Sequence, residues 1–179
     1  MKKFTVCAIL ACCAAILSAG DIEIKNTLKN SKIGAEKPIG WQLNGNPKFL
    51  GKGEIIQGSE KDEKAFKIVT QKNGTAFYRL GATPAKAGDK VKISADVKGK
   101  GKVTLGFYTY VGLAGYFSAV DAEKTVDLTD TFKEVEFEFV VKNGAKGQVC
   151  ENIRFFVKAQ PNTEVIVEDL EFEVDKKDK

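Results

Sequence analysis

The sequence predicts an all-β protein built as a two-sheet sandwich, and two observations carry that prediction. In several short segments, apolar side chains alternate with polar ones, which gives a strand one buried face and one wet face. Turn signals rich in glycine and asparagine separate these segments at regular spacing. Many short strands with such spacing favour a β-sandwich or barrel.

The alternation is clearest at residues 91–98, 134–139 and 170–174. Less regular apolar runs predict further strands at residues 66–70, 75–80, 103–111, 116–120, 153–159 and 165–167. Trp41 opens an early strand, and we expect its ring to pack in the core or at its edge. Glycines place turns at 51–53 and 99–101. We therefore expect about eight to ten strands in one domain.

Residues 1–20 have the layout of a secretory signal peptide. Lys2 and Lys3 precede an apolar run that ends in small residues before Asp21. This run is too short for a comfortable membrane span, and no later run approaches the required length. We expect an exported protein, secreted or periplasmic, with no membrane span. An alternative is lipidation, because residues 9–12 loosely resemble a bacterial lipoprotein cleavage box.

The predicted sandwich covers residues 21–174, and a charged tail follows at residues 175–179. Without the leader the chain has 26 basic and 24 acidic side chains, because the leader contains Lys2 and Lys3 and no acid. A nucleic-acid-binding protein would show a stronger basic excess. Cys150 is the one cysteine beyond the leader, so we expect no internal disulfide and a small buried side chain at this position.

The composition argues against an enzyme. The chain contains no histidine, which removes the usual general base and the commonest transition-metal ligand. Cys150 would have no histidine to activate it as a nucleophile. A pair of carboxylates could still hydrolyse a glycoside, and this remains the weakest of three alternatives.

Two predicted strands place unusual side chains on the face opposite the core. Strand 103–111 carries Tyr108 and Tyr110 there, and strand 153–159 carries Arg154 and Phe156. Aromatic rings stack on the C–H faces of sugars, and a planar guanidinium donates to paired hydroxyls. These four residues therefore form the candidate ligand-binding site. The alternative is that a second layer, a loop or a long strand crossing covers this face and the side chains simply pack there.

The order of motifs resembles the galactose-binding-like jelly-roll carbohydrate-binding modules, of the cellulose- and xylan-binding type found with secreted glycoside hydrolases. The resemblance rests on Asn26, on residues 38–41, 58–59 and 65–68, on 131–135 before a strand, and on the closing residues 165–172. It implies an antiparallel jelly-roll β-sandwich and a polysaccharide or oligosaccharide partner.

The resemblance also implies a structural calcium ion, held partly by an acid in the last strand. Asp169 matches that position, whereas residues 26–28 lack the Phe-Glu pair expected early in the chain. We expect no required cofactor. The sequence thus predicts a secreted, non-catalytic carbohydrate-binding protein. The alternative is a structural or adhesive module that binds a protein partner in an extracellular or periplasmic assembly.

Overall fold

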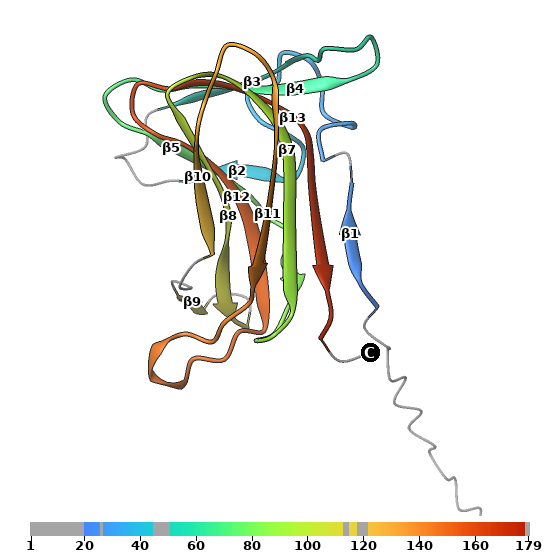
Figure 1. The fold of residues 1–179 in the computed structure, drawn as a ribbon, viewed down its shortest axis with the longest axis vertical. Helices are drawn as coiled ribbons and strands as arrows, with labels where there is room; N and C mark the ends of the chain where they lie inside the picture. The colour runs from blue at the N-terminus through green and yellow to red at the C-terminus, as the bar shows by residue number, and fades with distance from the viewer. Residues whose placement is uncertain (1–19, 26, 45–50, 113–114, 118–121, 178–179) are drawn as a thin grey trace, which may run out of the picture.

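The computed structural model describes residues 20–25, 27–44, 51–112, 115–117 and 122–177. These residues form two antiparallel sheets that pack face to face, as Figure 1 shows. Nearly all of the predicted signal peptide, and residues 118–120 of one predicted strand, lie outside the described residues. None of the described residues belongs to a helix long and apolar enough to cross a membrane.

The first sheet has six strands: β1 (Ile22–Ile24), β3 (Lys52–Gln57), β4 (Lys64–Val69), β7 (Lys90–Lys100), β11 (Lys133–Val140) and β13 (Glu164–Asp175). Their order is β11-β7-β13-β4-β3, and β1 pairs with β13. The first part of β13 lies beside β4 and its last part lies beside β1. A bulge between Glu168 and Glu171 separates the two parts, and Asp169 within it has a left-handed φ of 45°.

The second sheet has seven strands: β2 (Trp41–Leu43), β5 (Thr75–Arg79), β6 (Thr83–Pro84), β8 (Lys102–Val111), β9 (Gly115–Phe117), β10 (Glu123–Asp127) and β12 (Asn152–Ala159). Their order is β10-β8-β12-β5-β2, with β6 beside β12 and β9 beside β8. A short 3-10 helix, η1 (Ala145–Gly147), lies between β11 and β12.

Aromatic rings join the two sheets in the core. Phe155 of β12 stacks on Phe172 of β13 with ring centroids 3.9 Å apart. Trp41 lies 6.2 Å from the same Phe172 ring and is only 2% exposed, which confirms its predicted place in the core. Burial of such large rings contributes strongly to the driving force for folding.

The structure contains strands that the sequence pattern did not predict, namely β1, β3, β6 and β10. The turn predicted at residues 51–53 is wrong, because Lys52 and Gly53 belong to β3. A Cβ at Gly53 would lie 2.7 Å from the Phe66 ring, so glycine serves close packing here and not a turn. With β3, the described residues form thirteen strands, more than the eight to ten expected.

The expected charged tail also differs in part from the structure. Asp175 closes β13, and Lys176 is buried with its ammonium beside the buried carboxylate of Asp89. Lys176, which directly follows β13, is therefore anchored to the loop between β6 and β7. Cys150 is buried, as predicted, and among the described residues it forms no disulfide.

Candidate functional site

The outer face of the second sheet gathers all four tyrosines of the chain. Tyr108 lies opposite Arg154, and Tyr110 lies opposite Asn152, where β8 pairs with β12. Phe156 of β12 lies opposite Tyr78 of β5, and Tyr116 of β9 lies opposite Tyr110. Residues opposite one another in a ladder share a face, so these side chains form one surface. We call it the tyrosine face, and it consists of Tyr78, Tyr108, Tyr110, Tyr116, Arg154, Phe156 and Lys158.

Tyr108 is the centre of the ring contacts on this face. Its ring centroid lies 4.5 Å from that of Phe156, 5.5 Å from that of Tyr116 and 6.2 Å from that of Tyr78. Tyr116 also contacts Tyr110, at 5.8 Å between centroids. These tilted and edge-to-face arrangements are the favourable ones for aromatic pairs. The rings therefore support one another across four strands.

Two cations of β12 lie over rings of the tyrosine face. The guanidinium carbon of Arg154 is 4.7 Å from the centroid of the Tyr110 ring. The ammonium of Lys158 is 4.1 Å from the centroid of the Phe156 ring and 5.5 Å from that of Tyr108. Lys158 also forms an ion pair with Glu123 of β10. Cation–π contacts of this kind hold both positive groups at defined positions among the rings.

The four predicted site residues thus lie together, but they differ in exposure. Phe156 is 1% exposed and Tyr110 is 9% exposed, so both rings mainly support the face from below. Tyr108 and Arg154 are half-buried. Tyr116, which is 53% exposed, presents more of its ring than any of these. The surface open to a ligand is therefore centred on Tyr116 and Tyr108.

Burial also changes the acidity of the phenols. It raises the pKa of Tyr108 to about 12, against a smaller lowering by its hydrogen bond with Asn44. Burial raises the pKa of Tyr110 as well, and the positive charge of Arg154 opposes that shift. Both phenols therefore stay protonated at neutral pH and offer hydroxyl groups as donors and acceptors.

Sequence reasoning placed only four of the seven side chains at this site. Lys158 continues the alternation of Arg154 and Phe156, so the alternation alone places it on the same face as those two predicted site residues. Tyr78 and Tyr116 depend on which strands neighbour β12 and β8, which the sequence does not reveal. Arg79, the other arginine of the chain, is half-buried and donates from its guanidinium to the carbonyl oxygen of Gly81, outside the face.

The outer face of the first sheet has a different chemistry. Lys92 of β7 pairs with Glu136 of β11 at 2.7 Å, and Lys90 pairs with Glu138 at 3.5 Å. These side chains are about half exposed or more, as expected for a solvated sheet face. The aromatic surface is therefore a property of one face of the sandwich.

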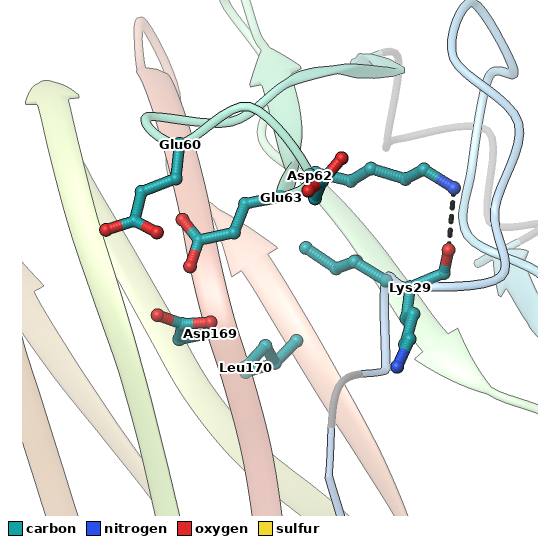
Figure 2. Close-up of a pocket in the computed structure, with 8 residues that line it drawn as sticks. Lys29, Glu60, Asp62, Glu63, Asp169 and Leu170 are labelled. Carbon is teal, nitrogen blue, oxygen red and sulfur yellow. Dashed lines mark hydrogen bonds between the residues drawn. The ribbon is translucent and has the colours of Figure 1, made fainter.

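Asp169, the predicted calcium ligand, lies elsewhere, at a pocket of about 310 Å³ beside the bulge of β13. Figure 2 shows the carboxylates of Glu60, Glu63 and Asp169 directed into the same space. Even so, among the described residues no three or more Asp, Glu, His or Cys side chains are arranged to hold a metal ion. The carboxylates of these described residues therefore do not by themselves form the calcium site that the resemblance implies.

No protein-family model matches the sequence, and no curated protein matches it either. Solved structures do match the fold. The xylan-binding domain CBM22-1 of Xyn10C from Paenibacillus barcinonensis is 13% identical, with a TM-score of 0.54 over 86% of this chain and 94% of that domain. A Stig cyclase from Fischerella sp. TAU is 9% identical, with a TM-score of 0.61 over 86% of this chain and 98% of the cyclase.

An arabinose-bound GH51 α-L-arabinofuranosidase is 13% identical, with a TM-score of 0.58 over 83% of this chain. The match spans only 25% of that longer protein. Identities this low establish a shared fold and leave function to the site. The chain therefore has the jelly-roll β-sandwich fold of the carbohydrate-binding modules, as its resemblance in sequence predicted.

Proposed function

We propose that this chain is an exported, non-catalytic carbohydrate-binding protein whose tyrosine face binds a polysaccharide or oligosaccharide. The observation that carries the proposal is the gathering of all four tyrosines on one outer sheet face. An aromatic patch on a face that is normally polar marks a site of interaction. Sugars suit this patch because their C–H faces stack on rings while their hydroxyls bond to polar groups.

The construction of the face supports binding at low entropic cost. Tyr108, Tyr110 and Arg154 lie on long neighbouring strands in the middle of the sheet. Rigid strands and mutual ring contacts fix these side chains before a ligand arrives, so little ordering is needed on binding. The xylan-binding domain with the same fold is consistent with this proposal.

The carboxylates of this face support a non-catalytic role. On β10, at the edge of the same sheet, Glu123 forms an ion pair with Lys158, and Asp127 forms one with Lys102. Three residues lie between the two acids along β10, so their Cα atoms are about 13 Å apart in an extended strand. Glycosidases hold their two carboxyl groups roughly 5 to 9.5 Å apart. Because the fold also occurs in a cyclase, the proposal rests on the face and not on the fold.

A glycan array tests the proposal with three proteins that begin at Asp21: the wild type, Tyr116→Ala and Phe132→Ala. Phe132 is a matched control, because its ring also lies under a lysine ammonium, that of Lys98, but outside the tyrosine face. We expect a glycan that binds the wild type and Phe132→Ala equally and Tyr116→Ala about tenfold more weakly. If folded wild type binds no glycan, the proposal fails and the structural or adhesive role replaces it.

A further inference from the structure

The turn at residues 27–31 is held against β4 by the side chain of Lys64. The ammonium of Lys64 donates hydrogen bonds to the carbonyl oxygens of Lys29 and Ser31, both at 2.6 Å. Figure 2 draws the bond to Lys29 as a dashed line. Within the turn, the backbone N–H of Ser31 donates to the carbonyl oxygen of Leu28 at 3.0 Å. Leu28 and Ser31 are buried, whereas Lys29 and Asn30 are exposed, so the turn lies at the surface and is anchored by two buried side chains.

The strand pattern explains why Lys64 reaches these carbonyls. Lys64 lies in the same alternation as Phe66 and Ile68, whose side chains are fully buried in the core. A lysine at the core-facing start of a strand must keep its charge solvated or give it acceptors. The two carbonyl oxygens of the turn are those acceptors, and hydrogen bonds from a charged donor are stronger than neutral ones.

The same turn borders the acidic pocket where the resemblance places a calcium ion. Hydrogen bonds between protein groups join the segments around this pocket. The hydroxyl of Thr27 donates to the carbonyl oxygen of Leu170 in β13 at 3.0 Å. The buried carboxylate of Glu168 accepts from the backbone N–H of Ser59 at 2.9 Å and from its hydroxyl at 2.6 Å. The early turn, the loop before β4 and the last strand are thereby joined by hydrogen bonds within the chain.

The pocket also carries positive charge of its own. Lys29 and Lys64 line it together with Glu60, Asp62 and Glu63. Among the described residues these carboxylates form no metal-holding group. The ammonium of Lys64 is a cation that bonds to the backbone of the turn. We infer that Lys64 does the work of the structural calcium ion that the resemblance implies, so that the sandwich reaches full stability without a divalent cation. This inference does not depend on glycan binding.

Thermal unfolding of the protein from Asp21 onward tests the inference. For the wild type we expect the same Tm, within about 1 °C, in millimolar EDTA and in millimolar CaCl2, since an ion that binds only the folded state would raise it. We expect Lys64→Met to lower the Tm by about 5 °C, because two hydrogen bonds from a charged donor are lost. Lys61→Met is the matched control, since Lys61 is an exposed lysine three residues earlier, and its Tm should not change.

Amide hydrogen exchange adds a local readout. In Lys64→Met, exchange should accelerate in residues 27–39 and stay unchanged in β8 and β12. The inference is overturned if calcium raises the Tm of the wild type, or if Lys64→Met and Lys61→Met have equal stability. The calcium comparison needs no variant, so it decides the question even if Lys64→Met does not fold.

Discussion

The guanidinium of Arg154 on β12 stacks over the ring of Tyr110 on β8, with 4.7 Å between the guanidinium carbon and the ring centroid. The two side chains also share a hydrogen bond. Arg154 lies directly opposite Tyr108 in the ladder, so its charge sits between two tyrosines in the middle of the sheet. The planar group is thus held in one orientation on the tyrosine face.

Replacing Arg154 by lysine should weaken glycan binding about tenfold, because an ammonium lacks the planar fork that donates to paired hydroxyls. The charge is kept, so the free energy of unfolding should change by less than about 1 kcal/mol. Calorimetric titration with the glycan from the array measures the affinity. Arg79→Lys, which changes the other arginine outside the face, should bind like the wild type, and equal losses in both variants would contradict a specific role for Arg154.

The raised pKa of Tyr108 predicts a loss of stability in alkali. An unfolded tyrosine ionises near pH 10, whereas burial raises the pKa of Tyr108 to about 12 in the folded protein. Stability from this group is therefore complete below pH 10 and falls as the pH rises from 10 to 12, because only the unfolded chain releases the proton. Urea unfolding of the wild type and Tyr108→Phe across this range measures the effect. We expect the variant to lose less stability, and parallel curves would show that Tyr108 is not the cause.

The buried ion pair between Asp89 and Lys176, the residue that directly follows β13, should contribute strongly to the free energy of unfolding. Burial alone would raise the pKa of Asp89, but the backbone N–H groups of Lys86 and Lys177 and the ammonium of Lys176 outweigh it and hold the pKa below its usual value. Lys176→Met leaves a buried carboxylate without its ammonium, at a loss of about 3–5 kcal/mol. Urea unfolding measures this loss.

Lys177→Met is the control for this pair, because the Lys177 side chain is exposed and only its backbone bonds to Asp89. Since the pKa of Asp89 is lowered in the folded state, the stability it contributes is present above about pH 4 and is lost as the pH falls below that. Equal stability of the two variants would show that the buried ion pair contributes nothing.

Cys150 should be unreactive in the folded protein. Its side chain is 1% exposed, and burial raises the pKa of its thiol, which lowers the fraction of reactive thiolate. We expect Ellman's reagent to label no thiol in the native protein that begins at Asp21 and one thiol after unfolding in urea. Rapid labelling of the native protein, or a disulfide-linked dimer on a non-reducing gel, would contradict this expectation.

The sequence predicted most of the fold because alternation is a local signal. Strands β7 and β11 carry regular patterns, and their buried and exposed faces match those expected. In β8 and β12 most of the core residues are as predicted, but Thr104, Tyr110 and Phe156 on the opposite face are buried as well. The short β3 escaped prediction because Gly53 looks like a turn residue, and only the close approach of the Glu36 carbonyl oxygen and the Phe66 ring explains it. Glycine in a strand depends on packing partners that the sequence does not identify.

The sequence predicts which side chains of one strand share a face, but it does not predict which strands lie side by side. Tyr108 and Tyr110 follow from the alternation of one strand, and Arg154 and Phe156 from that of another. Their meeting depends on the pairing of β8 with β12, which brings together residues more than 40 positions apart. The partners of Lys64 escaped prediction for the same reason, since backbone carbonyls leave no signature in a sequence.

NMR of the protein with labelled tyrosine and tryptophan rings tests the central claim most directly. All four tyrosines lie on the tyrosine face, so every tyrosine ring signal reports on it, while the single Trp41 is buried in the core and serves as an internal control. Titration with the glycan that binds on the array should shift the signals of Tyr116 and Tyr108 most and leave the Trp41 signal in place. Saturable glycan binding with all four tyrosine signals unmoved would place the site elsewhere and contradict the account.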